Sequence, residues 1–394
     1  MHPSARQYRP DPPAAWAGGL LTIDLGAVAA NYRLLHDRVG PGTTCAAAVK
    51  ADAYGLGADR IVPVLAAAGC RVFFVAHLAE GAAIRPLLGA DSTIFVLNGA
   101  MPGTEADLHG LGLAPVLNSM DQIARWQELA RRLDTPLPAA LQVDSGMSRF
   151  GLSDGDVDML MARAAPLAGI VPLLVMSHLA CADDPAHPAN LAQRTAFLRL
   201  RARLPRAPAS LAASSGLFLG PDWRFDMVRP GAALYGINPT PGHPNPMRPV
   251  VRLQARVVQT RWIGPGTAVG YGAAFIADRP SHVATLAVGY GDGFPRVLGG
   301  RGIAILPGRP EVKLPVIGRI SMDCLAVDVT DLGDGPLDAG TALDLIGPHN
   351  PLDTVAAAAG TIGYELLTGL GARYHRAHVT DDAVIDDMQK GSSA

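Results

Sequence analysis

Eight apolar segments, most of them followed by a stretch with helical spacing, occupy residues 44–236 and constrain the fold more than any other feature. The segments are apolar throughout, as is typical of parallel strands that helices cover on both faces. In intervening stretches such as residues 118–133 and 190–204, apolar residues recur every three or four positions among charged ones. Eight such units predict an α/β fold, a (β/α)8 barrel of the TIM type. The eight segments are 44–51, 72–76, 93–97, 114–118, 139–144, 172–180, 209–215 and 227–236.

A different pattern begins at about residue 244, within the proline-rich stretch 238–249. Short alternating runs, bounded by Gly, Pro or Asp, predict a C-terminal, mainly antiparallel β domain. We therefore expect a disordered leader over residues 1–19, a barrel over 20–243 and a β domain over 244–394. The alternating runs are 251–263, 282–290, 302–306, 324–329 and 342–347, and residues 355–370 show helical character in places.

Composition excludes several classes of partner. The 394 residues carry 33 Lys and Arg against 35 Asp and Glu, and no basic run is long enough to bind nucleic acid or an anionic membrane surface. The longest apolar stretch, 164–176, contains two prolines and is too short to span a bilayer. The four cysteines are scattered without a CxxC pair, which favours free thiols in a reducing compartment. We expect a cytoplasmic, soluble protein with a small-molecule partner.

Polar residues follow several of the predicted barrel strands at their C-terminal ends, where barrel enzymes carry their chemistry. Any one of them alone would be explained by a surface or capping role, but together they predict one site. A lysine among small apolar neighbours loses hydration, so its pKa falls and it becomes a nucleophile toward an aldehyde. The polar residues at the predicted strand ends are Lys50, Arg149, His178, Ser214, Ser215 and Arg229.

The loops after the seventh and eighth strands predict a phosphate site. Residues 213–220 offer two hydroxyls and a glycine before a helical turn, and Gly231 and Ala232 leave the backbone open. An aldehyde-bearing phosphate ester held by a lysine is pyridoxal 5′-phosphate. No second His or Cys lies at ligand spacing from His178, so we expect no metal site.

Seven motifs, in order, resemble those of the alanine racemases, which are barrel-type (fold type III) pyridoxal phosphate enzymes. They are AVKADAYGLG, VDSGMSRFGL, MSHLA, VRPGAALYG, VGYGDGFPR, IGRISMDCLAVDVT and GTIGYELL. The resemblance covers residues 20–379. It implies a homodimeric isomerase that interconverts L-alanine and D-alanine, either to supply D-alanine for peptidoglycan or to degrade it.

The resemblance also implies a role for each matching residue. Lys50 would carry the cofactor and act as one base, while Tyr290 would act as the second base from the partner subunit. His178 would stack on the pyridine ring and Arg229 would face its nitrogen. Arg149 and the Met322 N–H would bind the substrate carboxylate, Arg149 also contacting the phenolic oxygen of the cofactor. The phosphate contacts would be Tyr54, Tyr364, Ser215, Gly231 and Ala232.

The sequence departs from this family at one position and leaves three alternatives. Many members carry a carbamylated lysine two residues before the Asp of the DSGM motif, where this chain has Gln142, so a bound anion such as chloride or the amide itself must orient Arg149.

A racemase of broader specificity, acting on serine or other amino acids, is the first alternative. An amino-acid decarboxylase would want an acid in place of Arg229 and a cysteine near Cys324. A non-catalytic pyridoxal phosphate binding protein would resemble the barrel alone.

Overall fold

The computed structural model describes residues 11–333 and 337–380. The chain folds into two compact units. The barrel unit comprises Ala29–Leu234 and Asn238–Met247, and the described part of the β unit comprises residues 11–28, 235–237, 248–333 and 337–380.

The barrel unit is built on a closed parallel sheet, which confirms the predicted fold. The sheet has the order β2-β10-β9-β8-β7-β6-β5-β4-β3, in which β2 (Thr44–Cys45) and β3 (Ala47–Ala48) are the two halves of the first strand. Because β2 pairs with β10 and β3 pairs with β4, this strand closes the ring, and each of the eight predicted segments contributes a strand. The others are β4 (Val72–Val75), β5 (Thr93–Val96), β6 (Ala114–Leu117), β7 (Leu137–Gln142), β8 (Ile170–Met176), β9 (Ala209–Ser210) and β10 (Met227–Val228).

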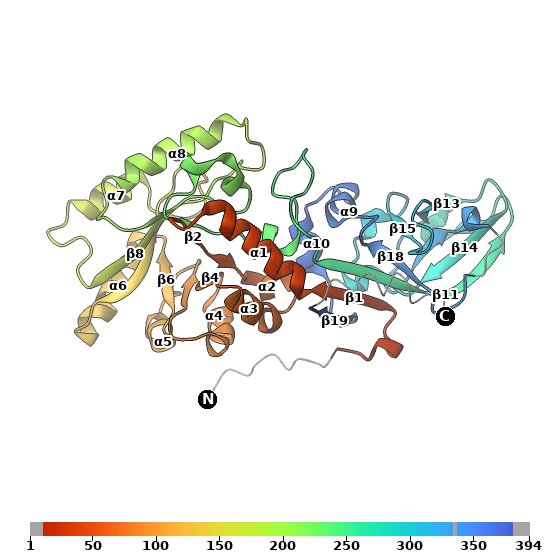
Figure 1. The fold of residues 1–394 in the computed structure, drawn as a ribbon, viewed down its shortest axis with the longest axis horizontal. Helices are drawn as coiled ribbons and strands as arrows, with labels where there is room; N and C mark the ends of the chain where they lie inside the picture. The colour runs from red at the N-terminus through yellow and green to blue at the C-terminus, as the bar shows by residue number, and fades with distance from the viewer. Residues whose placement is uncertain (1–10, 334–336, 381–394) are drawn as a thin grey trace. The chain divides into compact units, whose positions relative to one another are not determined.

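Helices lie around the outside of these strands (Figure 1). In α6, the Ser119 hydroxyl caps the first turn by accepting from the Gln122 N–H, and apolar residues spaced by three or four positions, such as Ile123 and Trp126, are buried. The helices of this part of the chain are α1 (Leu25–Val39), α2 (Lys50–Gly55), α3 (Ala58–Ala67), α4 (Leu78–Ile84), α5 (Glu105–Gly110), α6 (Met120–Leu133), α7 (Asp154–Met161) and α8 (Pro188–Arg201).

The barrel interior is packed by small and aromatic side chains. The rings of Phe74 on β4 and Phe95 on β5 stack with their centroids 4.9 Å apart, among alanines such as Ala46, Ala48 and Ala140. The interior is therefore a packed core, as in other barrels of this size, and it supports the side chains at the strand ends.

The β unit contains an eight-stranded sheet of order β14-β17-β16-β15-β18-β11-β1-β19, with a further pairing between β14 and β11. Its pairings are antiparallel except that of β1 with β19, so the mainly antiparallel domain is confirmed. The strands are β1 (Gly19–Asp24), β11 (Val251–Ile263), β14 (Ser281–Leu286), β15 (Ile303–Ile305), β16 (Lys313–Ile317), β17 (Leu325–Asp328), β18 (Ala342–Ile346) and β19 (His375–Val379). A hairpin of β12 (Ala268–Val269) and β13 (Phe275–Ile276), and helices α9 (Leu352–Ala358) and α10 (Gly363–Gly369), complete it.

The first strand divides the chain differently from the expected boundary at residue 20. Leu20 is paired with Gln254 of β11 on one side and with His375 of β19 on the other, so β1 belongs to the sheet of the β unit. Residues 1–10 of the expected leader lie outside the described residues. Residues 11–19 contain a 3-10 turn at Ala14–Trp16 and the first residue of β1.

No helix in the described ranges combines the length and the apolar character that crossing a membrane requires.

Candidate active site at the mouth of the barrel

Lys50 lies at the carboxyl end of the first barrel strand, as expected, although β3 ends at Ala48 and Lys50 begins α2. The Val49 N–H donates to the Phe74 carbonyl at 2.9 Å, which ties this end to β4. Loss of hydration and the nearby charge of Arg149 lower the pKa of the Lys50 amine, with a further contribution from Arg229, while Glu80 opposes them. The direction is the one that the apolar surroundings predict, and it favours the nucleophilic form of the amine.

The backbone after Lys50 adopts a left-handed conformation that the sequence does not predict. Ala51, Asp52, Ala53 and Tyr54 all have φ between 52° and 59°, although none of them is glycine. The left-handed region costs about 1–2 kcal/mol for each such residue, so four in succession cost roughly 4–8 kcal/mol. Surrounding contacts must hold this turn, and it places Tyr54 in the protein interior.

Buried Arg229 contacts His178, which is partly exposed. Arg229, with 5% of its surface exposed, donates from Nη2 to the Ser177 carbonyl at 2.7 Å and from Nη1 to the Ser210 hydroxyl. Burial lowers the pKa of Arg229 to about 10, so the guanidinium keeps its charge at neutral pH.

The same guanidinium determines the form of His178. Its Nη2 lies 3.3 Å from His178 Nδ1, and because arginine has no acceptor, Nδ1 must accept and the ring proton must be on Nε2. Loss of hydration, followed by the charge of Arg229, lowers the pKa of His178 to about 3. His178 is therefore neutral at neutral pH. It presents a flat ring and does not act as a proton-donating imidazolium.

Tyr54, Ser214 and Gly231 come together from the ends of three neighbouring strands. The Ser214 oxygen accepts from the Gly231 N–H at 3.0 Å and from the Ala233 N–H at 3.2 Å, which uses both lone pairs and leaves the hydroxyl proton to donate. A Cβ on Gly231 would meet the Tyr54 hydroxyl oxygen at 2.3 Å, so only glycine lets the tyrosine approach this backbone. Ser215 begins the 3-10 turn Ser215–Leu219, and Ala232 begins Ala232–Tyr235.

The loop that carries Arg149 is shaped by Asp144. One carboxylate oxygen accepts from the N–H groups of Gly146, Met147 and Ser148, at 2.9, 3.0 and 3.1 Å. Arg149 lies over the Phe150 ring at 5.8 Å. Gln142 is buried as the last residue of β7, two positions before Asp144.

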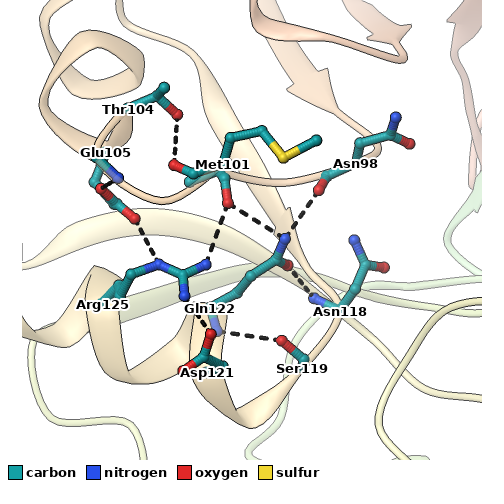
Figure 2. A network of polar contacts seen from close by, with 11 residues as sticks. Asn98, Met101, Thr104, Glu105, Asn118, Ser119, Asp121, Gln122 and Arg125 are labelled. Atoms are coloured by element: carbon teal, nitrogen blue, oxygen red, sulfur yellow. Dashed lines mark hydrogen bonds and ion pairs between the residues drawn. The ribbon is translucent and has the colours of Figure 1, made fainter.

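Arg149 also lines a cavity of about 530 Å³, whose wall includes the amide side chains of Asn98, Asn118 and Gln122. Gln122 accepts from the Asn118 N–H at 2.8 Å and donates to the Asn98 carbonyl at 2.9 Å, while Arg125 pairs with Glu105 at 2.7 Å (Figure 2). Asn98 and Asn118 are not among the site residues predicted from the sequence. Asn118 follows β6 directly and Asn98 lies two residues after the end of β5, so the strand-end rule that found Lys50 could have found them too.

Tyr290 and Met322 lie together in the β unit. The Gly291 N–H donates to the Met322 carbonyl at 2.8 Å and the Tyr290 N–H donates to the Ser321 carbonyl at 3.0 Å. The two side chains are 41% and 54% exposed, respectively. Arg373 braces this region by pairing with Asp292 and Asp323, each at 2.6 Å.

The structure thus gathers the predicted residues into two groups. Lys50, Arg149, His178 and Arg229 lie within electrostatic reach of one another in the barrel unit, beside the Tyr54 cluster. Tyr290, Met322 and Tyr364, the last on α10, belong to the β unit. Within residues 11–333 and 337–380, no three His, Cys, Asp or Glu side chains gather in a way that would hold a metal ion, and all four cysteines are free thiols.

Comparisons with known proteins agree over nearly the whole chain. The family model for the N-terminal domain of alanine racemase matches residues 23–239, and that for the C-terminal domain matches residues 250–378. An alanine racemase of Rhodospirillum rubrum is 51% identical over 362 residues, covering 92% of this chain and 96% of the relative. A catabolic alanine racemase of Mesorhizobium japonicum is 52% identical over 365 residues, covering 93% of this chain and 94% of the relative.

A solved structure gives the same picture. The crystal structure of alanine racemase from Bartonella henselae with covalently bound pyridoxal phosphate superposes with a TM-score of 0.88 at 43% identity, covering 92% of this chain and all of that one. The sequence evidence consists of two family models that together match most of the chain and of relatives that share about half of its residues. The barrel and the β unit agree with this evidence at the level of the fold. The chain belongs to the alanine racemase family.

Proposed function

We propose that this chain interconverts L-alanine and D-alanine with pyridoxal 5′-phosphate bound to Lys50. The observation that carries the proposal is the placement of the Lys50 amine, with its lowered pKa, beside Arg149, Arg229 and a neutral His178 at the barrel mouth. The family membership supports the reaction, and the Bartonella relative, which holds the cofactor covalently, supports the attachment.

The residues of the barrel unit fit the cofactor chemically. The Ser214 hydroxyl proton, left over after both lone pairs are used, and the backbone around Gly231 and Ala232 suit a phosphate group, and Tyr54 lies against the same backbone. The neutral ring of His178 offers a flat face to an aromatic partner, and buried Arg229 offers N–H donors only. When bound, pyridoxal 5′-phosphate supplies an aldehyde for the amine and a conjugated ring that withdraws electrons from the substrate Cα.

The chain's own residues would do the proton transfer and the positioning. Lys50, whose pKa is lowered, would remove or return the Cα proton on one face. Arg229 stays a cation at neutral pH and gives up no proton, which limits electron withdrawal and favours proton return over other outcomes. A decarboxylase would want an acid there, and the buried guanidinium does not supply it.

We also propose that Tyr290 is the second base, acting on the opposite face from the partner subunit of a homodimer. Bases on two faces of a planar centre invert it, because one removes the proton and the other returns it. The exposure of Tyr290 and the backbone bonds that hold its turn beside Met322 support this role. Arg149 and the Met322 N–H would bind the substrate carboxylate, and Tyr364 would contact the phosphate. We propose a cytoplasmic location, where free thiols persist.

Two measurements test the function. Borohydride reduction of the holoenzyme, followed by peptide mapping, should find the pyridoxyl group on Lys50. L-Alanine in heavy water should gain deuterium at Cα while its optical rotation decays to zero, without release of carbon dioxide. An adduct on another residue, or optical rotation that stays constant with active cofactor present, would contradict the proposal. The same assay with serine and lysine measures the breadth of the substrate range.

A further inference from the structure

Glu80 lies at the start of α4 and reaches the turn that carries Lys50 and Tyr54. Its Oε1 accepts from the Ala51 N–H at 2.7 Å, and Ala51 is the residue directly after Lys50. Its Oε2 accepts from the Ala76 N–H at 2.7 Å and from the His77 N–H at 3.2 Å. One carboxylate therefore joins the left-handed turn to the connection between β4 and α4.

With this contact, the residues on both sides of Lys50 are hydrogen-bonded to the β4–α4 segment. The residue before it, Val49, is bonded to the Phe74 carbonyl of β4, and the residue after it, Ala51, is bonded to Glu80. Both peptide groups that flank the lysine are thus fastened to the neighbouring strand–helix unit. A left-handed run of non-glycine residues persists only where surrounding contacts over-determine it, and Glu80 supplies such a contact at the first residue of the run.

We propose that Glu80 is a positioning residue for Lys50, and that its carboxylate holds the left-handed turn Ala51–Tyr54 in place. The inference rests on the proposed function only in treating Lys50 as the cofactor-bearing residue. Glu80 is not among the site residues predicted from the sequence. The available signal was an acid at the third position of a helix that follows a barrel strand, which is the position of a capping-box residue.

The carboxylate also has an electrostatic consequence. Arg149 and Arg229 lower the pKa of Lys50, His178 is neutral beside them, and Glu80 is the group that opposes the two cations. Removing its charge should lower the pKa of the amine further. Position and charge can then be separated, because Glu80→Gln removes the charge and keeps one acceptor, whereas Glu80→Ala removes both.

The test is hydrogen exchange of the full chain, with and without pyridoxal 5′-phosphate, followed on peptides covering residues 49–57. The matched control is Asp156→Asn, since Asp156 is the capping-box acid of α7 in the same unit and accepts from the Ser153 N–H at 2.9 Å. Bonds to a charged acceptor correspond to about a 10- to 100-fold change in an opening equilibrium, so Glu80→Ala should speed exchange at residues 51–54 by that factor. The control should leave this peptide unchanged.

A second readout uses the pH dependence of Lys50 acetylation in the cofactor-free full chain. Glu80→Gln should move the half-maximal rate to lower pH. If Glu80→Ala does not fold, Glu80→Gln carries the exchange test as well, because its single amide oxygen can accept at only one end of the bridge between Ala51 and Ala76 and exchange should still become faster. Unchanged exchange at residues 51–54 in the Glu80 variants would overturn the proposal. Borohydride mapping reports separately on the proposed function, because the exchange result does not depend on which residue carries the cofactor.

Discussion

The close approach of Tyr54 to Gly231 gives a prediction that can be worked from single atoms. A Cβ added at Gly231 would lie 2.3 Å from the Tyr54 hydroxyl oxygen, 3.1 Å from its Cζ and 3.2 Å from Ala48 Cβ. The first distance forces a displacement, whereas the other two need adjustments of a few tenths of an ångström. Gly231→Ala should therefore destabilise the protein by about 1–3 kcal/mol, the usual cost of overpacking.

A double-mutant cycle with Tyr54→Phe tests whether the Tyr54 hydroxyl causes the destabilisation by Gly231→Ala. Removing the oxygen removes the shortest contact, so Gly231→Ala should cost at least about 1 kcal/mol less when it is combined with Tyr54→Phe. The measurement is thermal unfolding of the cofactor-free full chain, where 1 kcal/mol corresponds to about 2–4 °C for a domain of this size. A titration with pyridoxal 5′-phosphate should show weaker binding for each single variant, because both disturb the corner that we propose binds the phosphate.

The control for this cycle is Gly155→Ala in α7, where the nearest atom to an added Cβ is the Ser153 oxygen at 3.9 Å. This change should be neutral or stabilising, since alanine favours a helix by about 1 kcal/mol over glycine. If Gly231→Ala costs the same with and without the Tyr54 hydroxyl, then the backbone and not the oxygen sets the cost, and the reasoning about this corner is wrong.

Three further predictions concern the second base, a buried ion pair and acid stability. Tyr290→Phe should keep the cofactor absorbance and lose at least about 100-fold in racemisation rate, and unaltered turnover would remove Tyr290 from the mechanism. Asp344→Ala should lower the free energy of unfolding by about 3–5 kcal/mol in denaturant titrations, because Asp344 pairs at 2.8 Å with Arg252, which is buried and would be left without its counterion. The folded-state pKa of His178, about 3, lies below its ordinary value of about 6.5, so the unfolded chain takes up a proton first and stability falls by up to about 1.4 kcal/mol per pH unit as the pH drops through this window. His178→Gln should flatten the stability–pH profile between those values, and an unchanged slope would count against a neutral histidine.

The barrel and the position of its lysine could be predicted because both are recorded in local patterns. Uninterrupted apolar runs such as residues 72–76 and 93–97 suit parallel strands covered on both faces, and both runs form barrel strands. The topology then brings the C-terminal ends of these strands to one mouth, so a polar residue at a strand end is a site candidate wherever it occurs. The pKa of Lys50 moves in the direction expected from its apolar neighbours in the chain, because burial lowers the hydration of the amine.

Only the tertiary structure decided which partners these elements take. The pattern of residues 20–25 indicates a strand, but this strand pairs with β11 and β19, far along the chain, and so belongs to the β unit. Likewise, nothing local marks Ala51–Tyr54 as left-handed, since non-glycine residues avoid that region unless distant groups hold them there. Apolar periodicity is a property of residues that are close in the chain, so it can be recognised from the sequence alone. Hydrogen-bond pairing and backbone strain depend on groups that meet only when the chain has folded.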